Sequence, residues 1–163
     1  MTKTPIVRPI SWINAAISVS ILAAFVLVAW TFARTSGIFW GAIAYLALSQ
    51  ILRRTIPHHH RSAICHCKRQ EFQQAITEFE KSIAFFSNNV WVDKYRAITM
   101  LSSSGMSYRE MGMVSLGFCY AQLGDGMSAR RIYEDCIRYY PNNGMAESAL
   151  RMLDAGAGSP NAK

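Results

Sequence analysis

The sequence predicts an all-α protein, with an N-terminal transmembrane helical hairpin followed by a short α-solenoid. Three observations lead to this fold class. Apolar segments without any charge occupy most of residues 10–52. Beyond residue 57 the apolar side chains recur at steps of three and four, which is the period of an amphipathic helix. The first 70 residues hold eight basic and no acidic side chains, whereas residues 71–163 hold nine basic and ten acidic ones.

The first apolar segment, residues 10–32, is long enough to cross a membrane. It has 23 residues and no charge, and a helix rises about 1.5 Å per residue, so it covers a hydrocarbon core of roughly 30 Å. Trp12 and Trp30 lie near its ends, where aromatic rings favour the level of the lipid headgroups. A cleaved signal peptide is the alternative, but its apolar region is shorter, at roughly 7 to 15 residues.

The second apolar segment, residues 37–52, is also uncharged but has only 16 residues, just under the usual minimum of about 17 for a span. Arg53 and Arg54 can extend its reach by placing their charges at the interface. Only residues 33–36 separate the two segments, so two spans form a tight antiparallel hairpin. The alternative is that this segment lies in the interface or packs against the soluble part.

The basic residues predict the orientation, because those that flank spans stay in the cytoplasm. Seven of the eight N-terminal basic residues share one side of the hairpin, and only Arg34 lies on the other. The hairpin places residues 1–9 in the cytoplasm, and both a hairpin and a single span place residues 53–163 there. We therefore expect a protein of the cell (inner) membrane, in contact with the lipid bilayer, whose four cysteines are reduced. Nucleic acid is not an expected partner, because the basic excess flanks the apolar segments rather than covering a folded domain.

Residues 53–155 are predicted to form a helical domain. In residues 71–86 one helical face carries Phe72, Ile76, Phe79 and other apolar side chains. Further helices are expected over residues 91–101, 107–123, 126–140 and 145–153, the last as a capping helix. The tail, residues 156–163, has no core-forming side chains and is expected to be disordered.

Residues 110–143 resemble a tetratricopeptide repeat, a pair of helices whose signature runs over about 34 residues. The signature is a large residue, a leucine-glycine pair and a tyrosine, then a turn, an alanine, an aromatic residue and a proline. Met113 replaces the common tryptophan, and Cys136 stands where alanine is frequent. The matching positions are Met113, Leu116, Gly117, Tyr120, Gly124, Ala129, Tyr133 and Pro141.

An earlier, degraded repeat is expected over about residues 57–90. Ala75 and Phe79 take its alanine and aromatic positions, and Ala63 takes the place of the glycine. Residues 91–101 are then an inserted helix or half of a divergent repeat. The layout is similar to small membrane-anchored bacterial proteins of this repeat class, which implies a bacterial inner membrane but adds no activity.

Two clusters of potential metal ligands, His58–His60 and Cys65–Cys67, lie close together in the sequence. Their spacing does not fit a standard zinc site, because Cys65 and Cys67 point about 200° apart on a helix. His59 and His66, or His58 and Cys65, can share a face. The repeat already explains this segment as a helix, so neither a metal nor a cofactor is predicted. No catalytic motif appears either, and the chain is predicted not to be an enzyme.

The resemblance implies a concave groove that binds a protein partner and is lined by the first helix of each repeat. The alternative is that residues 91–101 fill this groove. The leading hypothesis is a membrane-anchored scaffold or assembly protein that binds its partner at the cytoplasmic face. A second hypothesis is an accessory subunit of a membrane complex, held through small residues of the hairpin (Gly41, Ala42, Ala44 and Ala47), and a third is a metal-responsive protein using His58–Cys67. The groove residues are Met111, Val114, Phe118, Ala121 and Gln122.

Overall fold

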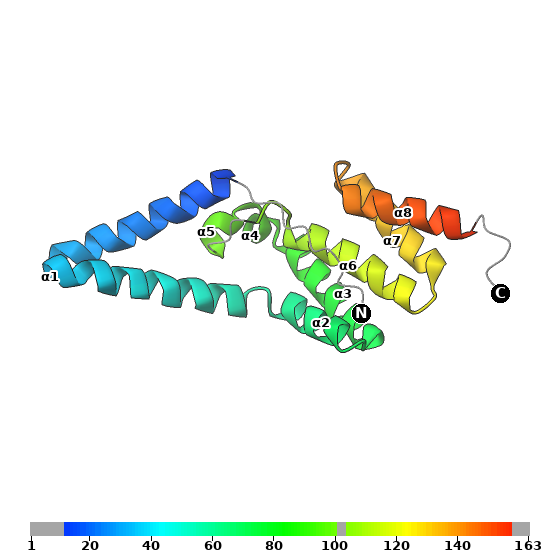
Figure 1. The fold of residues 1–163 in the computed structure, drawn as a ribbon, viewed down its shortest axis with the longest axis horizontal. Helices are drawn as coiled ribbons and strands as arrows, with labels where there is room; N and C mark the ends of the chain where they lie inside the picture. Colours follow the sequence, from blue (N-terminus) through cyan, green and yellow to red (C-terminus); the bar gives the residue numbers. More distant parts are fainter. Residues whose placement is uncertain (1–11, 101–103, 158–163) are drawn as a thin grey trace. The chain divides into compact units, whose positions relative to one another are not determined.

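The structure is a computed structural model that describes residues 12–100 and 104–157 (Figure 1). All regular secondary structure in these residues is helical, which confirms the predicted all-α class. The chain divides into two compact units and passes between them more than once. Unit 1 comprises the described residues of Met1–Pro57 and Asn89–Ser107, and unit 2 those of His58–Asn88 and Tyr108–Lys163.

Unit 1 is built on α1, Trp12–Thr55, which reverses direction near its middle and forms two antiparallel arms (Figure 1). Arg34 has a φ of 44°, a left-handed conformation that side chains disfavour, and it lies in the predicted linker 33–36. The arms approach closely at Gly41, where an added Cβ would lie 2.8 Å from the carbonyl oxygen of Phe25. The rings of Phe25 and Tyr45 meet edge to face, 6.1 Å apart. α1 is therefore a helical hairpin with a glycine at the crossing of its arms.

The outer surface of this hairpin is apolar. One face of the second arm is buried at every fourth position, and the remaining surface of both arms carries large exposed hydrophobic side chains. Within the described residues, one segment, Trp12–Phe32, is long and apolar enough to cross a membrane; residues 37–52 do not reach that length on their own. The buried positions are Gly37, Gly41, Tyr45 and Ser49.

Two short helices complete unit 1: α4 (Val90–Lys94) and α5 (Arg96–Thr99). They replace the single helix expected over residues 91–101, because the chain leaves helical geometry at Tyr95, whose φ is −99° and ψ is 30°. Both ends of the hairpin are tied to this region. Asn14 Nδ2 donates to the carbonyl oxygen of Ser104 at 3.2 Å, and Arg53 Nε donates to that of Met100 at 3.3 Å.

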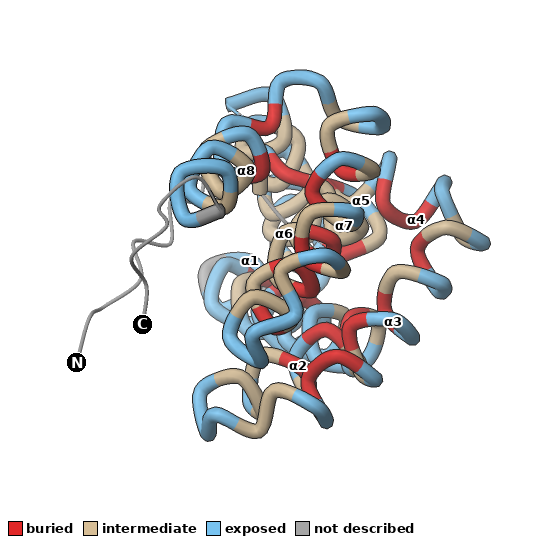
Figure 2. Tube along the Cα trace, turned by 90° about the vertical axis from the view of Figure 1, so that its right-hand side faces the viewer, coloured by how far each residue is buried: buried red, intermediate tan, exposed pale blue. Residues whose placement is uncertain are grey.

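Unit 2 contains two helical pairs and a further helix. α2 (His58–Lys68) and α3 (Phe72–Asn88) form the first pair, α6 (Tyr108–Gln122) and α7 (Gly126–Tyr139) the second, and α8 (Gly144–Ala157) packs on α7. The pairs meet through α3 and α6. Figure 2 shows the buried residues on the sides of these helices that face one another.

Two hydrophobic clusters share α6. The first joins α2, α3 and α6 around the fully buried Phe79, and the second joins α6, α7 and α8 around Tyr133. Since both clusters need side chains from α6, neither helical pair has a complete core alone. The buried members are Ala63, Ala75, Ile76, Phe79, Leu116 and Cys119 in the first cluster, and Met113, Ala129, Tyr133, Cys136 and Ala146 in the second.

The ends of α7 and α8 follow from their capping residues. Gly124 has a φ of 79° in the turn before α7, and Asp125 then caps that helix by accepting a hydrogen bond from Ser128 N at 3.0 Å. Asn143 accepts likewise from Ala146 N at 2.9 Å. α8 continues to Ala157, so the expected tail 156–163 begins inside a helix; residues 158–163 lie outside the described residues, as do residues 1–9.

Candidate functional site

The second helical pair owes its geometry to the signature residues. A Cβ on Gly117 would lie 2.7 Å from ring carbons of Tyr133, so the glycine lets α6 and α7 approach each other there. Ala129 and Cys136, on the same face of α7 as Tyr133, are fully buried. Tyr120 OH donates to Glu80 Oε1 at 3.3 Å, which joins this pair to α3. Gly117, Tyr120, Ala129 and Tyr133 are therefore packing positions between helices, whereas Gly124 and Pro141 are exposed outside them.

The first pair repeats this pattern with different residues. Ala63, Ala75 and Phe79 are fully buried in the first cluster. Their spacing along the chain equals that of Gly117, Ala129 and Tyr133. A positive φ of 62° at Gln70 turns the chain between α2 and α3.

The five predicted groove residues all lie on α6. Phe118 packs against the first cluster, and its ring meets Phe72 edge to face at 6.2 Å. Val114 and Ala121 pack against the second cluster, and Met111 is half-buried. Gln122, at the C-terminal end of the helix, is exposed. The face is therefore partly covered by its neighbours and has a polar, accessible end.

Residues 91–101 are the alternative occupant of the groove, and that alternative stays a prediction. α4 and α5 belong to unit 1. Their large side chains, Trp91, Tyr95 and Ile98, are each at least half exposed. Leu101 lies outside the described residues.

The side chains of the histidine-cysteine segment, His58–Cys67, do not converge on one point. His59 Nδ1 lies 2.8 Å from Glu78 Oε2, and His66 Nδ1 lies 2.6 Å from Glu71 Oε2. His60 is buried between the rings of Phe79 and Tyr108. Across residues 12–100 and 104–157, no three histidine, cysteine or acidic side chains are placed to hold a metal ion.

The small residues of the second arm are also not equivalent. Gly41 is buried against the first arm, so it closes the hairpin and does not face a partner. Ala44 and Ala47 are exposed and Ala42 is half-buried. The part of this stripe that remains available is therefore the alanine pair at Ala44 and Ala47.

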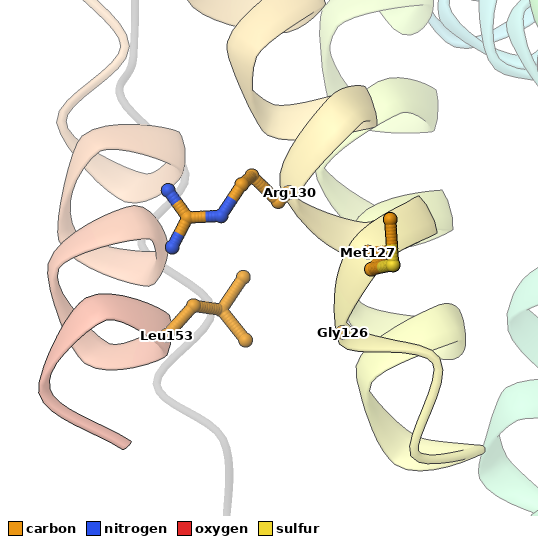
Figure 3. Close-up of a pocket in the computed structure, with 4 residues that line it drawn as sticks. All are labelled: Gly126, Met127, Arg130 and Leu153. Carbon is orange, nitrogen blue, oxygen red and sulfur yellow. The ribbon is translucent and has the colours of Figure 1, made fainter. Parts of the chain in front are cut away.

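A shallow hollow lies between α7 and α8 (Figure 3). It is lined by Gly126, Met127, Arg130 and Leu153. Arg130 pairs with Asp154 across the two helices. Because the Arg130 guanidinium is already paired with the Asp154 carboxylate, it is not available to bind an anion in this hollow. None of the five predicted groove residues lines the hollow.

Two buried core groups, the phenol of Tyr133 and the thiol of Cys136, have raised pKa values. Burial raises the pKa of Tyr133 to about 12, and burial together with the nearby Glu110 carboxylate raises the pKa of Cys136 to about 12.

One contact was not expected from the sequence: Cys67 Sγ on α2 lies 3.1 Å from Cys119 Sγ on α6. A separation of 52 residues gives no local pattern that reveals such a contact.

A family model described as a tetratricopeptide repeat matches residues 112–143. This match confirms that the chain contains a tetratricopeptide repeat, and it falls on α6, α7 and the turn after them. Comparison with curated proteins and with solved structures found no match. Repeats of this kind are typically non-catalytic modules for protein–protein interaction.

Proposed function

Because the chain contains a tetratricopeptide repeat, we propose that it is a membrane-anchored protein that binds a protein partner, in a scaffold or assembly role. The α1 hairpin is the anchor, and unit 2 is the binding module on the cytoplasmic side of the inner membrane. The observation that carries the proposal is the contrast between the matched repeat and the apolar outer surface of α1 in the same chain.

The anchor is supported by exposure. Soluble proteins rarely leave large contiguous apolar surfaces in water, because each such surface favours association. Val19, Phe39 and Trp40 are each more than half exposed on the two arms. Lipid is the solvent in which that surface costs least, and the basic residues at the base of the hairpin favour a cytoplasmic position for the rest of the chain.

The binding module is supported by the position of α6. In stacked helical pairs the first helix of each pair lines the concave side, and α2 and α6 are the first helices of the two pairs of unit 2. We take α2–α3 as a second, degraded repeat, because Ala63, Ala75 and Phe79 are buried like their counterparts. Phe118 is the central side chain of the proposed surface and Gln122 its exposed end.

Photocrosslinking in cells tests both parts. A photoreactive amino acid is placed at Phe118 or at Gln122, with a matched probe at Arg131 on the exposed side of α7 as the control. We expect the same discrete protein adduct from Phe118 and Gln122, in the membrane fraction, and none from Arg131. Equal labelling from all three positions, or adducts with lipid alone, would contradict a binding surface on α6.

The second candidate function is an accessory subunit of a membrane complex, and Ala44 and Ala47 favour it because small exposed residues let helices approach in lipid. Replacing both with phenylalanine should then release the protein from its complex on a native gel, with unit 2 still folded. If the bulky variant still co-migrates and the Phe118 adduct persists, the contacts lie on unit 2 instead.

A further inference from the structure

Cys67 and Cys119 bring two thiols into contact from helices that are far apart in the sequence. Their Sγ atoms lie 3.1 Å apart, and both cysteines are free. The two helices that carry them are held by the first cluster, in which Cys119 is buried with Ala63 of α2. A disulfide has an S–S distance of about 2.05 Å, so the sulfurs need to approach by only about 1 Å.

We propose that Cys67 and Cys119 form a redox-active pair, which closes an intramolecular disulfide between α2 and α6 when the protein meets a thiol oxidant. The proposal does not depend on the membrane anchor or on the groove. It requires only the packing of α2 against α6 within unit 2.

The two thiols have different roles. Cys67 is half-buried and can be reached from solvent, whereas Cys119 is fully buried. A hydrogen bond from Cys119 lowers the pKa of Cys67, and the same bond together with burial raises the pKa of Cys119. Since the thiolate is the nucleophile, Cys67 reacts first and Cys119 resolves the product.

The chemistry balances with a low-molecular-weight disulfide such as oxidised glutathione as the oxidant. The Cys67 thiolate attacks one sulfur of glutathione disulfide, which forms a mixed disulfide and expels one glutathione thiolate. Cys119 then loses its proton and attacks Cys67 Sγ, which forms the protein disulfide and expels the second glutathione thiolate. Two electrons pass from the protein to the oxidant, and the two thiol protons end on two glutathione molecules.

The other two cysteines are not placed to compete. Cys65 is exposed but points to another side of α2, because residues two apart on a helix diverge by about 200°. Cys136 is buried in the second cluster, where its pKa is raised to about 12. The crosslink is therefore specific, and it fixes the first helix of one pair to the first helix of the next, beside Phe118.

The test uses the full chain in detergent micelles, equilibrated with glutathione buffers of graded oxidised fraction. Acid quenches the exchange, and the protein is then denatured and its free thiols are tagged with a maleimide polymer. We expect the oxidised wild type to lose two of its four tags as a monomer, with a linked Cys67–Cys119 peptide in the digest. Cys65→Ser and Cys136→Ser should behave in the same way, each with two tags lost.

Cys67→Ser should remove the response entirely, because no partner thiol for Cys119 remains. Since the side chain at position 67 is half-buried, we expect serine to be accommodated there. Circular dichroism that matches the wild type shows that this variant is folded. The proposal is overturned if oxidised wild type keeps all four tags, if Cys67→Ser still loses two, or if the linked peptide contains Cys65 or Cys136. Disulfide-linked dimers in place of the internal crosslink would overturn it equally.

Discussion

The α1 hairpin and unit 2 use the same kinds of residue on opposite sides of their helices. In α1 most large side chains are exposed, and the buried positions of the second arm hold Gly37, Gly41 and Ser49, with Tyr45 as the one large side chain among them. In unit 2 the large side chains, Phe79, Phe86 and Tyr133, are buried, and the surface carries charge. The contrast is the one that the proposed membrane anchor requires, since a helix buries the side chains that its surroundings do not favour.

The largest effect is expected from replacing a phenylalanine with alanine, made once in unit 2 and once in the α1 hairpin. Phe79→Ala removes a ring that is 0% exposed, and it should lower the free energy of unfolding of unit 2 by about 3–5 kcal/mol. Phe39→Ala, at a ring that is 65% exposed, should change it by less than about 0.5 kcal/mol. Hydrogen exchange of α3 and α6 amides in the detergent-solubilised chain measures both. Similar losses from the two variants would erase the contrast.

A charge on the hairpin surface tests which solvent that surface meets. Val19→Arg, at a side chain 64% exposed near the middle of the apolar segment, should cost about 2.5–3.5 kcal/mol of membrane insertion. That is roughly a 100-fold shift from membrane to soluble or degraded protein. Met127→Arg, at an 87% exposed residue of unit 2, serves as the matched control and should remain in the membrane fraction. If both variants fractionate like the wild type, α1 is not an anchor.

A methyl group at the crossing of α6 and α7 tests the tightness of unit 2. Gly117→Ala would place a Cβ 2.7 Å from the Tyr133 ring and should destabilise unit 2 by about 1–3 kcal/mol. Gly126→Ala, where an added Cβ meets nothing within 4 Å, should be neutral or stabilise by about 0.5 kcal/mol. Thermal unfolding midpoints of the two variants give the comparison. A stable Gly117→Ala protein would mean that the helices can separate at this point.

The smallest effect is a pH dependence confined to unit 2. Glu78 accepts a hydrogen bond from Lys81 Nζ at 2.7 Å and lies 2.8 Å from His59, and these contacts lower its pKa. A lowered carboxyl pKa adds stability above the ordinary value of 4.5, and that stability is lost as the pH falls through the lowered value. Glu78→Gln should therefore cost about 0.5 kcal/mol near pH 7 and nothing once the carboxyl group is protonated.

Denaturant titrations at several pH values measure this difference. Glu80→Gln is the control, because Glu80 is exposed and bonds to the Tyr120 hydroxyl rather than to a cation. A loss of equal size at every pH would assign the role of Glu78 to packing instead of charge.

Much of this fold follows from local patterns. The three-and-four spacing places α3, α6 and α7 within one or two residues of their observed ends, because each has a continuous apolar face and a turn signal such as Gly124. The match over residues 112–143 confirms the repeat that Met113, Gly117 and Tyr133 predict.

Local sequence patterns do not predict two features of the structure: the break between α4 and α5, and the contacts between helices that are far apart in the sequence. The break at Tyr95 lies in a segment whose apolar spacing resembles one helix, so the sequence did not predict it. The reversal at Arg34, in contrast, falls within the predicted linker 33–36. The accessibility of Phe118 depends on Phe72, 46 positions away in the sequence. Its role in binding stays a prediction for the crosslinking experiment.

The interleaved path of the chain also sets an order of events at the ribosome. Synthesis delivers the hairpin first and then α2 and α3, whose apolar face lacks Leu116 and Cys119 until the whole insertion 89–107 has been made. Nascent unit 2 therefore stays incomplete after the hairpin has been made, with the face of α3 that carries Phe79 not yet covered by α6. Lengthening residues 89–107 would extend that vulnerable interval without removing a single contact from the finished core.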